Sequence, residues 1–96
     1  MAHTKSARKR ARQSEARRVR NKPQRSALRT QLKKTAAALE SGDVGSAEAE
    51  LKKAVRALDK AAGKRLIHKN QAARRKSRLS ARAVALRAAR QAERTD

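Results

Sequence analysis

Residues 28–63 read LRTQLKKTAAALESGDVGSAEAELKKAVRALDKAAG, and this stretch decides the fold. Its larger apolar residues recur at intervals of three and four, the spacing that places side chains on one face of a helix. Gly42 is suited to end the first helix in a left-handed conformation, and Asp43 is suited to cap the start of the second. The pattern predicts two helices joined by a short turn, which favours antiparallel neighbours.

A third helix is predicted after Gly63, which closes the second one. It should run from near His68 to about Arg90, with Leu66 and Ile67 at its entry. No segment alternates as a strand does, so the fold class is all-α, an antiparallel three-helix bundle. The expected core faces are Leu28, Leu32, Thr35, Ala36 and Leu39 in the first helix; Val44, Ala47, Leu51, Ala54, Val55, Leu58 and Ala62 in the second; and Ala73, Ser77, Ser80, Val84, Leu79 and Leu86 in the third.

The first helix should extend back from residue 28 to about Ser6. Pro23 lies inside it, and proline lacks an N–H and clashes with the carbonyl four residues back, so it kinks or restarts the helix. We favour a kink. One domain is expected over residues 1–96, with a basic extension of the first helix at 1–27, the bundle at 28–90 and a tail at 91–96.

The composition indicates a polyanionic partner and a thin core. The chain has 28 Lys and Arg against 8 Asp and Glu, a net charge of +20, far more than solubility needs. Most of its hydrophobic residues are alanines, so a ligand that binds only the folded form should help to hold the helices together. Cysteine is absent, and no apolar run has the length of a transmembrane helix, which leaves the cytoplasm as the default location.

Charge is distributed unevenly along the chain. Residues 1–40 carry +11, residues 41–60 carry no net charge, and residues 61–96 carry +9. In the middle helix Glu48 is spaced to pair with Lys52, and Glu50 with Lys53. We therefore expect the second helix to have a structural role and the first and third helices to bind the partner.

Lysines and arginines between residues 5 and 25 surround the whole circumference of the predicted helix. This is typical of an element threaded among phosphates, and we expect it to be largely unfolded until it binds. Without aromatic residues the chain has no platform on which to stack single-stranded bases, so folded nucleic acid is the expected target. Readings that stay open are a solvated or nuclear-localisation charge run, an organelle transit peptide and a histone-like DNA-compacting protein.

No constellation for catalysis or metal binding is evident. His3 and His68 are far apart and lack partners at ligand spacing, and His68 reads as a helix cap or a phosphate contact. The acidic residues cluster on the neutral helix, and no glycine-rich phosphate loop or activated nucleophile occurs. We expect no enzyme activity, no cofactor, no metal and no small-molecule substrate. Membrane binding is not expected either, because a bulky apolar face is missing.

Several segments together resemble the bacterial ribosomal protein S20 family of the small (30S) subunit. They are MAHTKSARKR at residues 1–10, RNK at 20–22, SALRT at 26–30, ALESGD at 38–43, ALDKAA at 57–62 and, most specifically, IHKNQAARRKSRL at 67–79. Pro23 departs from the family pattern, which places a straight first helix in question.

The resemblance implies a three-helix bundle with an extended first helix that supports 30S assembly. Its partners would be the 5′ domain and the long penultimate stem of 16S ribosomal RNA, together with other 30S components. By analogy the RNA-binding residues in the first helix are Lys5, Arg8, Lys9, Arg10, Arg12, Arg17, Arg18, Arg20, Asn21, Lys22, Arg25 and Arg29. Those in the third helix region are His68, Lys69, Asn70, Arg74, Arg75, Lys76, Ser77, Arg78 and Arg82.

Overall fold

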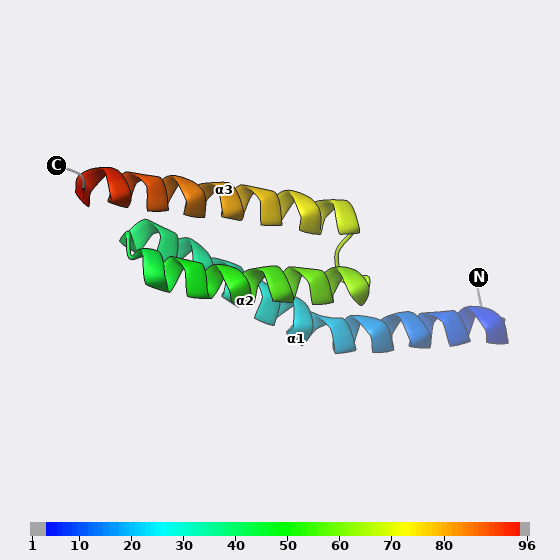
Figure 1. Cartoon of the computed structure of the whole chain (residues 1–96). Coiled ribbons are helices and arrows are strands. Elements are labelled where there is room, and N and C mark those ends of the chain that lie inside the picture. Colours follow the sequence, from blue (N-terminus) through cyan, green and yellow to red (C-terminus); the bar gives the residue numbers. More distant parts are fainter. Residues whose placement is uncertain (1–3, 95–96) are drawn as a thin grey trace.

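The computed structural model describes residues 4–94, which form three helices and, within that range, no strand (Figure 1). The helices are α1 (Lys5–Ser41), α2 (Val44–Gly63) and α3 (Lys69–Arg94), and consecutive helices run antiparallel. The prediction of an all-α three-helix bundle with a long first helix is confirmed. Its principal extents are 73 × 20 × 19 Å, because the amino-terminal half of α1 projects beyond the other two helices.

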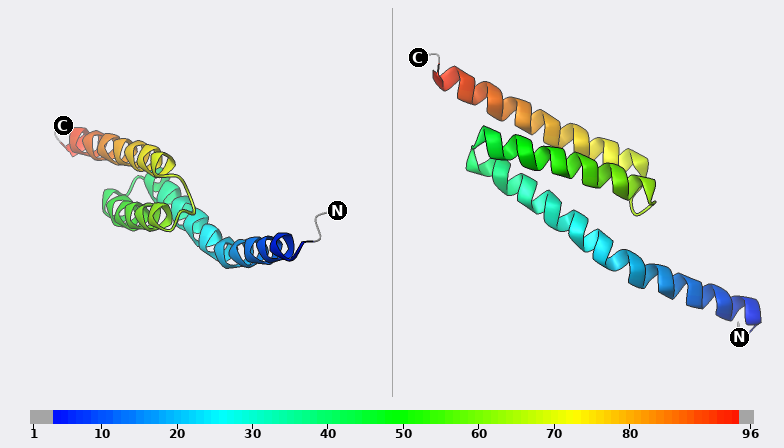
Figure 2. Two further views of the ribbon diagram at one scale, coloured as in Figure 1. Left: turned by 90° about the vertical axis from the view of Figure 1, so that its right-hand side faces the viewer. Right: turned by 60° about the horizontal axis from the view of Figure 1, so that its bottom comes forward.

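The helix α1 is held at both ends by local chemistry. Thr4 caps its start, where Oγ1 accepts a hydrogen bond of 3.2 Å from the N–H of Ala7. Gly42 ends it with a φ of 79°, the left-handed conformation predicted for this glycine. Between these caps the helix continues through Pro23 without a break, and its path bends in the cyan-to-blue part of the ribbon (Figure 2). The bend agrees with the missing N–H of Pro23, which deprives the carbonyl of Val19 of its helical partner.

The helix α2 begins and ends with two different caps. The carboxylate of Asp43 accepts a hydrogen bond of 3.1 Å from the N–H of Gly45, as predicted. At the other end Arg65, with a φ of 62°, adopts the left-handed conformation that usually selects glycine. The N–H of Leu66 donates to the carbonyl of Ala61 at 2.9 Å, which completes the turn toward α3.

The core lies on both sides of α2, which packs against α1 and α3, while α1 and α3 contact each other far less. Among residues 4–94, only two of the larger side chains, Leu58 and Thr35, are completely buried. The remaining core is mainly alanine, as expected for a thin core. Its buried members are Ala38, Leu39, Ala47, Ala54, Leu58, Ala61, Ala72 and Ala83.

The predicted core face of α3 was wrong for its main positions. Ala73, Ser77 and Val84 are exposed, and Val84 keeps 68% of its accessible surface. The side of α3 that packs against α2 carries Ala72, Lys76, Leu79, Ala83 and Leu86, at alternating intervals of four and three. Alanines lie on every side of this helix, so the side that packs against α2 is determined by the burial of Leu79 and Leu86. Lys76 lies on that same side and is therefore in the interface.

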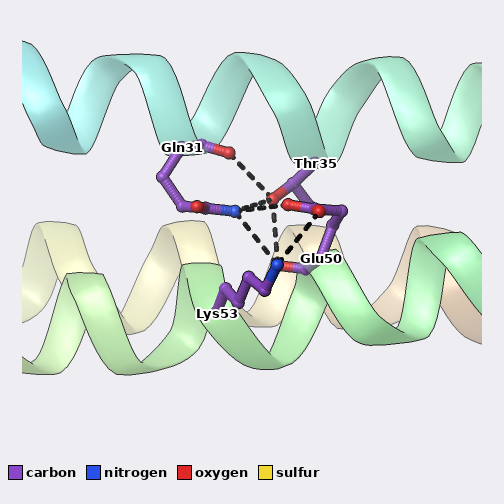
Figure 3. A network of polar contacts seen from close by, with 4 residues as sticks. All are labelled: Gln31, Thr35, Glu50 and Lys53. Atoms are coloured by element: carbon purple, nitrogen blue, oxygen red, sulfur yellow. Dashed lines mark hydrogen bonds and ion pairs between the residues drawn. The ribbon is translucent and has the colours of Figure 1, made fainter.

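A polar network joins α1 to α2 (Figure 3). The hydroxyl of buried Thr35 lies 2.9 Å from the carbonyl oxygen of Gln31 and 3.1 Å from that of Glu50. The side-chain amide of Gln31 donates to the Glu50 carboxylate at 2.8 Å, and Lys53 lies 3.5 Å from the same carboxylate, as its spacing predicted. This network fixes the register of the two helices.

Three contacts align α3 along α2. Lys76 pairs with Asp59 at 2.7 Å, and Glu48 pairs with Arg87 of α3 at 3.5 Å, so Glu48 turns toward α3 rather than toward Lys52. At the far end Nε of Arg90 donates a hydrogen bond of 2.9 Å to the carbonyl oxygen of Gly42. The carboxyl-terminal turns of α3 are thereby tied to the turn between α1 and α2.

Candidate nucleic-acid interface

The amino-terminal arm, residues 5–22 of α1, is a helix with basic side chains on all sides. All of its lysines and arginines are exposed, and it lies beyond the ends of α2 and α3 (Figure 1). Its one acidic residue, Glu15, pairs with Arg18 at 2.7 Å. The hydrogen bond from Arg18 lowers the pKa of the Glu15 carboxyl, which therefore stays ionised beside it. Within residues 4–94 no acidic group neutralises another arm cation, so their charge is free for an anionic partner.

In α3 the predicted residues divide into an exposed row and an inward-facing position. Arg74, Arg78 and Arg82 follow one another at intervals of four, which places them along one side of the helix, with Arg75 next to them. All four are exposed. Lys76 instead faces α2 and is engaged by Asp59.

The residues at the start of α3 combine capping with exposure. His68 is the residue before the helix, and its Nδ1 accepts a hydrogen bond of 3.1 Å from the N–H of Asn70. The prediction that His68 caps this helix is thus confirmed. His68, Lys69, Asn70 and Ser77 are exposed.

One groove brings predicted residues of α1 and α3 together. Arg25 and Arg29 of α1 and Arg75 of α3 line it, and all three are exposed. Half-buried Leu28, Leu32 and Ile67 also line it, together with Gln71. The arm does not take part in this groove, because it leaves the bundle in the direction away from the rest of α3 (Figure 2).

A basic surface on α2 was not predicted from the sequence. Lys52, Lys53, Arg56 and Lys60 line a shallow hollow over the alanines of the helix. The neutral total for residues 41–60 concealed it, because the acidic residues gather at the start of the helix and Asp59 is occupied by Lys76. Counting the two halves of the helix separately would have revealed this surface.

Two kinds of site are absent from the described part of the chain. Residues 4–94 contain no group of three or more His, Cys, Asp or Glu side chains arranged to hold a metal ion. None of the three helices has an apolar stretch long enough to cross a membrane. His3, and residues 95 and 96 of the predicted tail, lie outside the described residues.

The family model described as "Ribosomal protein S20" matches residues 2–84 of the chain. The chain belongs to the ribosomal protein S20 family. A curated relative, "Small ribosomal subunit protein bS20" of Pseudoalteromonas atlantica, is 57% identical over 86 residues, which cover 90% of this chain and 99% of that protein. The protein of the same name from Francisella tularensis subsp. novicida is 56% identical, covering 90% of this chain and 96% of its own.

Membership of the S20 family assigns the chain a structural role in the ribosome. The family consists of ribosomal structural proteins, and this S20 chain is not an enzyme. The family match ends at residue 84, before Arg87 and Arg90, so the contacts of these residues with Glu48 and Gly42 lie outside it.

Proposed function

We propose that this S20-family chain is a structural constituent of the small ribosomal subunit in the bacterial cytoplasm, and that it binds 16S ribosomal RNA directly and supports 30S assembly. The amino-terminal arm is the observation that carries the proposal. A helix that docks on a flat anionic surface needs one basic face, whereas this arm is cationic on all sides and has no apolar face to pack. Such a helix is suited to a channel between RNA helices, where phosphates surround it.

The second contact surface is the exposed arginine row of α3, with Arg75 and the residues at the start of the helix. Arginine presents a planar fork that matches two phosphate oxygens, which suits backbone contacts in folded RNA. The ammonium group of Lys76 already pairs with Asp59 of α2. Lys76 therefore supports this surface by holding α3 in place against α2. The 5′ domain and the long penultimate stem of 16S RNA are the proposed targets, on the strength of the family resemblance.

The arm should fold as it binds. No buried side chain precedes Thr35 in α1, so tertiary packing does not support the arm, and its adjacent cations repel one another. We expect the helical circular dichroism signal to increase when a 16S 5′-domain transcript is added. Full helicity before RNA is added would contradict this.

A salt titration of binding to the 16S 5′-domain transcript tests the proposal. If about 6 to 10 phosphates are contacted, affinity should fall roughly 10³- to 10⁵-fold between 50 and 200 mM salt. Replacing Arg8 and Arg12 with Gln should reduce the salt slope by about one for each lost phosphate contact. The matched control replaces Lys33 and Arg94, two exposed cations outside the proposed surfaces, and should leave the slope nearly unchanged.

Competition distinguishes RNA binding from DNA compaction. Duplex DNA shares the phosphate charge but lacks the 2′-hydroxyls and the A-form shape of folded RNA. We expect duplex DNA at equal nucleotide concentration not to displace the 16S transcript. Efficient displacement would favour the DNA-compacting reading instead.

A further inference from the structure

The groove between α1 and α3 combines two features that phosphate binding alone does not require. Its rim carries three guanidinium groups, from Arg25, Arg29 and Arg75, and no acidic residue lines it. Its lining also includes Leu28, Leu32 and Ile67, each left half-buried because α1 and α3 barely contact each other. An apolar surface among free cations fits a ligand that is both planar and anionic.

A nucleotide has this combination. Its base offers apolar faces that leave water favourably when they lie against leucine and isoleucine, and its flanking phosphates pair with arginines. Guanidinium planes also stack on unstacked bases in RNA-binding proteins. Gln71, whose amide carries both a donor and an acceptor, lies at the same groove and is suited to the edge of a base.

We propose that this groove binds one unpaired nucleotide extruded from folded RNA, with its base between Leu28, Leu32, Ile67 and the guanidinium plane of Arg75, and its phosphates on Arg25 and Arg29. The inference rests on the proposed function and adds a contact with a base to the phosphate contacts. Bases within a duplex are covered by their neighbours, whereas a bulged base costs least to unstack. In a chain without aromatic residues, this groove provides the apolar surface that such a base needs.

The neighbouring groove between α1 and α2 is less suited to this role. Its cations are Lys53, Lys60 and Lys64, whose ammonium groups are point charges without a plane to stack on a base. The amide of Gln31, which also lines it, is already bonded to the Glu50 carboxylate. The groove between α1 and α3 is therefore the better candidate for the nucleotide site.

Two RNA hairpins of equal length and composition test the proposal with the full chain at one fixed salt concentration. One carries a single bulged 2-aminopurine, and in the other the same base is paired. We expect the bulged hairpin to bind about tenfold more tightly, toward the lower end of the range for a base on an aromatic platform because the groove has no ring, and its fluorescence to change on binding. Arg75→Lys keeps the charge but removes the guanidinium plane, so it should abolish most of this preference.

Arg74→Lys is the matched control, because Arg74 is the adjacent exposed arginine and does not line the groove. It should preserve the preference for the bulge. Ile67→Ala should weaken the preference by removing apolar surface, with its fold checked by circular dichroism; if it unfolds, the two arginine variants decide the matter. Equal affinity of the wild-type chain for both hairpins, or an equal effect of the two arginine variants on the preference, would overturn the nucleotide site. Either result would leave binding to the 16S transcript intact, which separates this inference from the proposed function.

Discussion

The ammonium group of Lys76 lies 2.7 Å from the carboxylate of Asp59, so a cation that the family resemblance predicts to bind RNA also joins α3 to α2. Lys76 is 35% exposed and Asp59 is 56% exposed. The pair is therefore partly hydrated, and such pairs contribute modestly to stability. Its position in the α2–α3 interface indicates that it aligns the two helices.

We expect Lys76→Gln to weaken RNA binding much less than Arg78→Gln, because only Arg78 has a fully available charge. The free energy of unfolding should fall by roughly 0.2–1 kcal/mol in Lys76→Gln, the range for exposed pairs. A double-mutant cycle with Asp59→Asn, measured by urea denaturation, isolates the pair. If both variants lost RNA affinity equally, Lys76 would be an RNA contact despite its ion pair.

The boundaries of the helices were predictable because local chemistry determines them. Gly42 and Asp43 specify an end and a start within two residues, and both behave as the sequence indicates. The inward face of α3 was not predictable to the same degree, because alanines occupy all its sides and the choice depends on how α2 packs. The groove was not predictable either, since Arg25 and Arg75 are distant in sequence and only the angle between α1 and α3 brings them together.

Thr35 and Thr30 form a matched pair for testing the α1–α2 network. Both hydroxyls bond the carbonyl four residues back, at 2.9 and 3.0 Å, but only Thr35 is buried and also reaches the Glu50 carbonyl. Thr35→Val keeps the shape and removes the hydroxyl's hydrogen bonds, while both carbonyls keep their helical partners, so the free energy of unfolding should fall by about 0.5–1.5 kcal/mol. Thr30→Val should change it by less than about 0.5 kcal/mol, as expected for an exposed site. Equal effects in thermal denaturation would show that the network does not stabilise the helix pair.

Glu50 should make stability depend on pH in the acidic range. The hydrogen bond from Gln31 lowers the pKa of the Glu50 carboxyl, assisted by the charge of Lys53 and opposed by partial burial. Because the pKa is lower in the folded state, this contribution is present above the unfolded pKa and is lost as pH falls through the folded pKa. Melting temperature should therefore decline more steeply below about pH 4.3, the ordinary glutamate value, in the wild-type chain than in Gln31→Ala. Identical pH profiles of the two proteins would remove Gln31 as the cause.

Gly42 and Gly63 should respond to alanine in opposite directions. Gly42 has a φ of 79°, where a Cβ costs roughly 1–2 kcal/mol, and a Cβ there would also collide with the guanidinium of Arg90. Gly63 is helical, and nothing lies close to the position of its Cβ, so Gly63→Ala should raise the free energy of unfolding by roughly 0.5–1 kcal/mol. Measuring Gly42→Ala with and without Arg90→Ala separates the two causes: backbone strain persists when Arg90 is absent, whereas the collision and the loss of the Arg90 hydrogen bond do not. If Gly42→Ala were neutral in both backgrounds, the left-handed turn would not be what ends α1.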